Sequence, residues 1–101
     1  MADFWISFRI RDTDKRKEDA RRDTLVSLVN AVSTMVWDET TSFFLLRSEH
    51  SIDEIGKYLA DALDEKQDTL LMRQLDHASA RIIGVYYDGD LNKFLPYLKG
   101  V

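Results

Sequence analysis

The sequence predicts a single α+β domain, because its apolar residues repeat with the period of a strand in some segments and with the period of a helix in others. Four segments typical of strands and two typical of helices follow one another in the order β-α-β-β-α-β. The length of 101 residues and the 45% hydrophobic content suit one globular core. We therefore expect one domain over residues 1–101, with its core at 3–76 and a C-terminal extension at 77–101.

The segment from Phe4 to Ile10 is predicted to be a strand, because apolar and more polar residues alternate along it. After the polar turn at residues 12–14, the apolar spacing changes to that of a helix with one buried stripe. This stripe consists of Leu25, Leu28, Val29 and Val32. Asp14 is placed to cap the helix, since its carboxylate can accept hydrogen bonds from amides of the first turn.

A β-hairpin, a second helix and a fourth strand follow. Residues 35–37 and 42–47 are apolar strands joined by a short polar connection. Ser51 and Glu54 have the spacing of a capping box, which predicts the start of the second helix, and residues 69–75 form the last strand. This order is the ferredoxin-like arrangement, so we expect a four-stranded antiparallel sheet with both helices on one face.

The C-terminal extension is less regular than the core. Residues 80–87 are expected to form a fifth strand, and residues 90–98, which contain Pro96, a short helix. Such an extension can pack on the sheet of its own chain or cross to a second copy as an added strand or docked helix.

The face of the sheet opposite the helices is predicted to be an interface. It carries too many apolar side chains for simple exposure to water. A second copy of the chain is the expected cover, because closed two-fold pairs are the commonest soluble assemblies. The alternative is that the extension covers this face within one chain. The residues expected at the dimer interface are Trp5, Phe43, Leu45, Met72, Ile82 and Val85.

Charge and composition narrow the classes of function. The net charge of −4 disfavours nucleic-acid binding, which usually requires an excess of basic residues. The candidate contacts for an anion or a nucleic acid are Arg9, Arg11, Arg21 and Arg22. Ion pairs with neighbouring acids are the simpler interpretation of the basic residues in the first helix. The absence of cysteine excludes disulfides, thiolate metal sites and cysteine nucleophiles.

The N-terminal segment has no continuous apolar run of the kind found in a signal peptide or a membrane span. We therefore expect a cytoplasmic protein that does not enter a membrane.

Five segments carry a family resemblance. They are residues 4–10, Trp37, residues 42–48, residues 51–55 and residues 68–71. In these segments, which span about the first three quarters of the chain, the sequence resembles small ferredoxin-like proteins related to the compact CRISPR-associated nuclease and integration-complex family. Within that group it is most similar to the SinR-like branch. The resemblance implies a dimer whose two-fold axis brings the ends of the first strands together.

The resemblance also implies a metal-binding aspartate at the end of the first strand in the nuclease members. Here the aligned position holds Arg9, whose guanidinium cannot ligate a metal. Asp12 and Asp14 are the alternative ligands for Mg²⁺, although a turn and a helix cap are the roles that we expect for them. The sequence therefore predicts a dimeric module without a cofactor or catalytic activity that acts by protein association; the alternative is a weak metal-dependent nuclease or nucleic-acid-binding protein.

Overall fold

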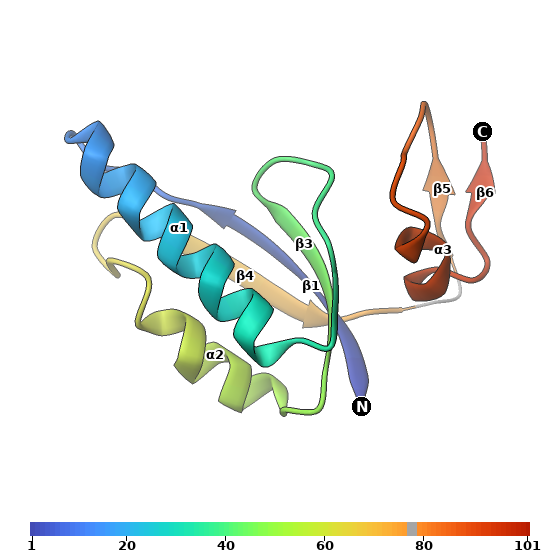
Figure 1. Ribbon diagram of the computed structural model, residues 1–101, viewed down its shortest axis with the longest axis horizontal. Helices are drawn as coiled ribbons and strands as arrows, with labels where there is room; N and C mark the ends of the chain where they lie inside the picture. The colour runs from blue at the N-terminus through green and yellow to red at the C-terminus, as the bar shows by residue number, and fades with distance from the viewer. Residues whose placement is uncertain (77–78) are drawn as a thin grey trace.

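The structure, a computed structural model, describes residues 1–76 and 79–101 (Figure 1). Residues 77 and 78, the first two of the predicted extension, lie outside the described residues. The elements of the core are β1 (Ala2–Arg9), α1 (Lys15–Val32), β2 (Met35–Trp37), β3 (Phe43–Ser48), α2 (Ile52–Ala60) and β4 (Thr69–Gln74). The predicted order of strands and helices is confirmed.

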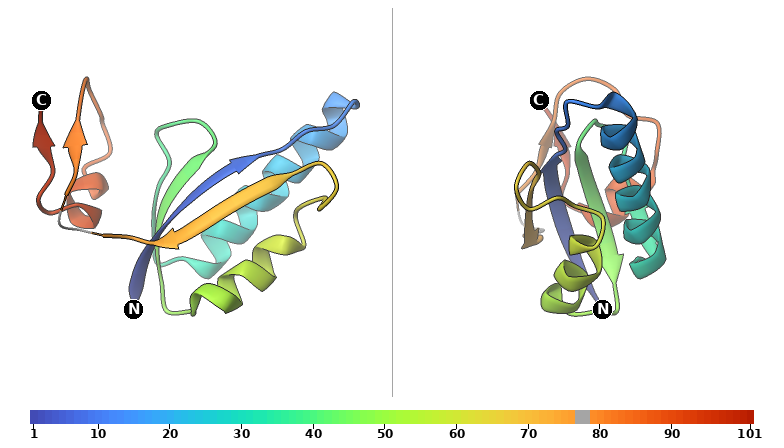
Figure 2. Two further views of the ribbon diagram at one scale, coloured as in Figure 1. Left: turned by 180° about the vertical axis from the view of Figure 1, so that it is seen from behind. Right: turned by 90° about the vertical axis from the view of Figure 1, so that its left-hand side faces the viewer.

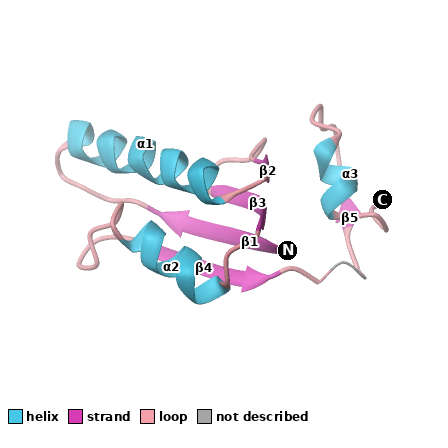
Figure 3. Cartoon of the chain, turned by 60° about the horizontal axis from the view of Figure 1, so that its bottom comes forward, coloured by secondary structure: helices cyan, strands magenta, loops and turns pink. Residues whose placement is uncertain are grey.

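The sheet has four antiparallel strands in the order β2-β3-β1-β4, as a ferredoxin-like fold requires. In the register, Ile6 of the central strand β1 lies between Phe44 of β3 and Met72 of β4. Both long helices lie on the same face of this sheet (Figures 2 and 3). The sequence-based fold class is thus correct.

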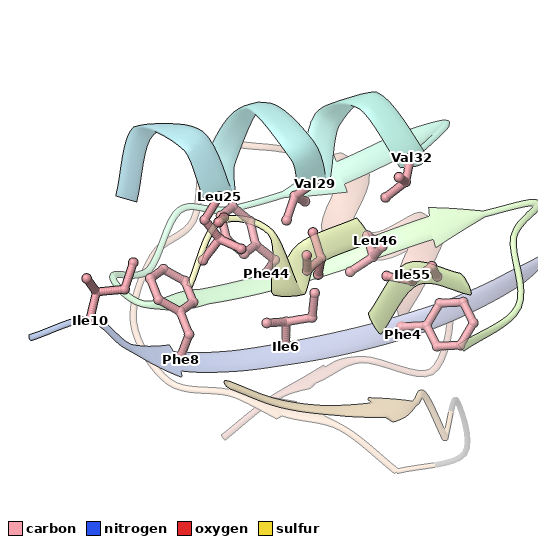
Figure 4. Packing of buried hydrophobic residues seen from close by; sticks show 12 residues of the cluster. Phe4, Ile6, Phe8, Ile10, Leu25, Val29, Val32, Phe44, Leu46 and Ile55 are labelled. Carbon is pink, nitrogen blue, oxygen red and sulfur yellow. The ribbon is translucent and has the colours of Figure 1, made fainter. Parts of the chain in front are cut away.

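The main core lies between the sheet and the two helices (Figure 4). The alternating residues of β1 face this layer, which explains the period of two in the sequence. The rings of Phe8 and Phe44 stack with their centroids 5.5 Å apart. The best-buried members of the cluster are Phe4, Ile6, Leu25, Val29, Leu46, Ile55 and Leu59.

The predicted helix caps are present. The Asp14 side chain accepts from the backbone amide of Arg16 at the start of α1. At the start of α2, the Ser51 hydroxyl accepts from the Glu54 amide, and the Glu54 carboxylate accepts from the Ser51 amide. These local bonds satisfy amides that have no partner within the helix.

The C-terminal tail, residues 79–101 of the described chain, contains β5 (Arg81–Ile82), α3 (Asp90–Phe94) and β6 (Lys99–Gly100). The fifth strand is shorter than predicted, and it pairs in parallel with β6 instead of joining the main sheet. Gly84, at a φ of +96°, breaks the extended run. The helix ends at Phe94, because Pro96 disfavours a helical conformation at Leu95.

The tail packs against the sheet face opposite the two long helices. Trp37 and Leu45 of the sheet are buried together with Leu91 and Phe94 of the tail in a second apolar cluster. Trp5, Phe43 and Ile82 pack at its margin, among other partly buried side chains. For this part of the sheet, the cover is therefore the chain's own tail, the alternative that the sequence left open.

None of the helices in the described part of the chain combines the length and the apolar character that a bilayer crossing requires.

Candidate functional site

Arg21, a predicted anion contact, is used within the fold. Its Nη1 lies 2.8 Å from Asp12 Oδ2, and its Nε lies 2.9 Å from Asp68 Oδ2. Its Nη2 also donates to the carbonyl of Arg11 at 2.7 Å. Helix α1 holds this guanidinium over the end of β1, so all three nitrogens already have partners there. Arg21 is therefore held by partners within the fold.

Asp68 forms the centre of this cluster. Its side chain has no exposed surface, and its carboxylate accepts from the backbone amides of Arg11 and Asp64 as well as from Arg21. Burial alone would raise the pKa of Asp68, but the two amides and the guanidinium outweigh it and hold that pKa below its usual range. The hydrogen bond from Arg21 likewise lowers the pKa of Asp12.

The alternative metal ligands both have structural partners. Asp12 accepts from the Asp14 amide and from Arg21, while Asp14 caps α1. Within the residues that the structure describes, no three His, Cys, Asp or Glu side chains gather in a way that suits a metal ion. The turn and cap predicted for these two aspartates are present.

Of the remaining basic candidates, Arg9 and Arg22 lie on different surfaces. Arg9 is exposed on the side of β1 that faces away from α1 and α2. The Arg22 guanidinium lies 5.5 Å from the centre of the Phe8 ring, on the helix-covered side. Arg11 follows β1, and its backbone amide is bound to Asp68. The structure therefore does not gather Arg9 and Arg22 into one basic patch.

The tail leaves one part of its sheet face bare, beside the edge strand β4. In the register, Trp5 lies opposite Arg73, Ser7 opposite Leu71, and Arg9 opposite Thr69. The side chain of Leu71 is 59% exposed, which is unusual for a large apolar residue in a strand. Leu71 was not among the predicted interface residues, although it lies in the apolar run of residues 69–72 that marks this strand.

Met72 does not belong to this bare surface. It pairs with Ile6, points to the opposite side of the sheet and packs against the main core. Neighbouring residues of a strand alternate between faces, so Leu71 and Met72 cannot share one. Of the predicted interface residues, Met72 thus lies on the opposite face of the sheet from Trp5, Phe43 and Leu45.

Strand β4 also borders a groove, which we call the α2–β4 groove. β4 is at the end of the strand order, so its outer edge has no neighbouring strand among the described elements. The groove has a volume of about 960 Å³ and runs between this edge and α2. Its apolar walls include Ile52, Gly56, Leu63, Leu70 and Met72. An edge strand beside an apolar groove is a ready template for another strand.

The tail carries an apolar strip that its own chain does not cover. Ile83, Val85 and Tyr87 are 82%, 80% and 88% exposed, and they occupy alternate positions of one segment. Ile82 and Tyr86, on the other side of the segment, pack into the second cluster. We call Ile83, Val85 and Tyr87 the tail strip. Of the predicted interface residues in the tail, Val85 is thus exposed and Ile82 is turned inward.

The tail is fastened by a side chain that the sequence did not indicate. The Glu39 carboxylate, in the β2–β3 connection, accepts from the backbone amides of Tyr87 and Asp88 and from the Trp37 indole. The two amides lower the pKa of Glu39, and the indole adds to this effect. An acidic residue in a polar loop carries no signal in the sequence for such a long-range contact.

Comparison with known proteins reveals the fold but not the family. No family model matches the chain, and the curated proteins give no match. Among solved structures, the chain is similar to a hypothetical protein, TT1823, from Thermus thermophilus, with a TM-score of 0.55 and 21% sequence identity. The match covers 74% of this chain and 82% of that one. At this identity the likeness supports the fold alone.

Proposed function

We propose that this chain is a non-catalytic module that forms a homodimer and acts by protein association. The observation that carries this proposal is that one chain presents two complementary features. The edge of β4 borders the α2–β4 groove and has no neighbouring strand among the described elements, and the tail strip exposes large apolar side chains to water. Strand addition to an exposed sheet edge is a common mode of protein recognition. In a two-fold pair each copy supplies both features to the other, so both edges are covered at once.

The geometry of the two features supports their pairing. The tail strip exposes apolar side chains at alternate positions of an irregular segment that bends at Gly84, and the α2–β4 groove offers apolar walls of matching character. Leu71, exposed on the other side of the same strand, adds apolar surface that a partner would remove from water. Arg9 and Arg73 border this surface and are placed to contact acidic groups of a partner.

The test is a mass measurement by light scattering over a dilution series at micromolar concentrations. A dimer is expected for the unmodified chain, and Val85→Lys should shift it towards the monomer. Tyr97→Lys is the matched control, since Tyr97 is an exposed tail residue outside the strip. A monomer at every concentration would overturn the proposal, and so would a dimer that Val85→Lys leaves unchanged.

A nuclease or nucleic-acid-binding protein remains the competing candidate, favoured by the exposed Arg9 and Arg73 on one face. Labelled DNA and RNA, incubated with the chain at low salt with Mg²⁺ or Mn²⁺, distinguish the two. The proposed module neither binds nor cleaves them. Cleavage that Asp12→Ala abolishes would contradict a non-catalytic function, with circular dichroism as a check that the variant still folds.

A further inference from the structure

The space between the sheet and the tail forms a pocket that is separate from the α2–β4 groove. We call it the tail pocket. It has a volume of about 260 Å³, and its walls include Trp5, Trp37, Phe43 and Leu45 from the sheet and Leu91 and Leu98 from the tail. The α2–β4 groove lies at the edge strand β4, next to the helix layer, and shares none of these residues. The tail pocket and the α2–β4 groove are therefore two distinct sites.

We propose that the tail pocket binds an uncharged, planar ring compound of one or two fused rings. Its size is the first reason. An apolar cavity of about 150 Å³ in another protein accommodates benzene. The larger tail pocket has room for a second fused ring, but it is too small for a helix or for a strand with its side chains.

The chemistry of the walls is the second reason. Both tryptophans of the chain line the pocket, and the rings of Trp37 and Phe43 meet edge to face with centroids 6.5 Å apart. Such rings favour a planar aromatic guest, which can adopt the same offset or edge-to-face contacts.

The buried part of the walls indicates an uncharged guest. The indole nitrogen of Trp37 is already bonded to Glu39, so this ring offers the pocket only its apolar surface. Leu45 and Leu91 are almost fully buried beside it. The charged and hydroxyl residues of the lining, Asp76, Ser79 and Arg81, are exposed to solvent. A charged group placed against the buried apolar walls would therefore lose its hydration without gaining a partner there, which is costly.

Indole is a suitable probe, and the two tryptophans report on it. In the ¹⁵N-labelled protein each tryptophan gives one indole N–H signal in a two-dimensional NMR spectrum. Titration with unlabelled indole should shift both signals together and saturate at one indole per chain. The backbone amides of Gly56 and Leu71, in the groove and on the bare strand, should not move. Shifts that grow without saturation, or that affect only one tryptophan, would overturn the proposal.

A variant that fills the pocket sharpens the test. Leu98→Phe should weaken indole binding roughly tenfold, because the added ring carbons occupy part of the volume that the guest needs. Leu95→Phe narrows the same pocket from a neighbouring position and should give the same loss, which guards against misfolding of either variant. Leu63→Phe, in the α2–β4 groove, is the matched control and should leave binding unchanged. Equal affinity in all the variants would contradict the assignment.

Discussion

The Nε atom of Arg21 lies 2.9 Å from the Asp68 carboxylate, which joins the middle of α1 to the loop that precedes β4. The same carboxylate accepts from the amides of Arg11 and Asp64, so one buried side chain connects the end of β1, the first long helix and the start of the edge strand. A residue with this many partners has a large effect when it is changed, because each lost bond leaves a buried donor without an acceptor.

Asp68→Asn should therefore destabilise the fold by about 3 kcal/mol, since the neutral amide cannot replace a buried carboxylate that holds a guanidinium and two amides. Urea unfolding at neutral pH, followed by circular dichroism, measures the change in the free energy of unfolding. Glu65→Gln is the matched control, because Glu65 is an exposed acid in the same loop. A loss no greater than that of the control would mean that the Asp68 cluster contributes little to stability.

The pH dependence of stability follows from the same carboxylates. The folded-state pKa values of Asp68 and Asp12 lie below the value of about 3.9 typical of an unfolded chain. Their contribution is therefore complete above about pH 4 and is lost as the pH falls through the lower folded-state values. Unfolding curves between neutral pH and pH 2 should show that the unmodified chain loses more stability than Asp68→Asn. A constant difference between the two proteins would contradict this linkage.

The sequence predicted the core because its signals are local. Alternation in β1, the apolar stripe of α1 and the Ser51–Glu54 capping box each depend on residues that are neighbours in the chain. The order of these elements then left few topologies for the sheet. The position of Met72 was missed because an apolar run does not show which of its residues point to which face.

The site was harder to predict than the fold because it depends on contacts between distant segments. Arg21 reaches Asp68 across 47 residues, and Glu39 reaches Tyr87 across 48. Nothing in the local sequence distinguishes these side chains from other charged residues on the surface. The tail cover of Trp37 and Leu45 depends on contacts with Leu91 and Phe94, which lie far along the chain, and local sequence does not indicate such contacts.

Glu39→Gln should loosen the attachment of the tail. The amide side chain loses the negative charge that two backbone amides and an indole share. Hydrogen exchange at Tyr87 and Asp88 should become faster, whereas the amides of β1 should keep their protection. Asp38→Asn, at the neighbouring exposed acid, is the control. Unchanged exchange at Tyr87 and Asp88 would mean that the apolar cluster holds the tail without the help of Glu39.

Two glycine substitutions should change stability in opposite directions. Gly56 lies inside α2, and a Cβ added there would lie 3.9 Å from Cε of Met72, an ordinary contact distance. Gly56→Ala should therefore stabilise the chain by about 1 kcal/mol, the usual gain of alanine over glycine within a helix.

Gly84 has open space around it, but its φ of +96° is a conformation that side chains with a Cβ rarely adopt. Gly84→Ala should therefore cost about 1–2 kcal/mol if the tail keeps its turn. Thermal unfolding of both variants measures the two changes. Because Gly84 turns the segment that links Ile82 to Tyr86, which both pack into the second cluster, Gly84→Ala should also expose this cluster, which would appear as a red shift of tryptophan fluorescence. Stabilisation by Gly84→Ala would show that this turn does not set the path of the tail.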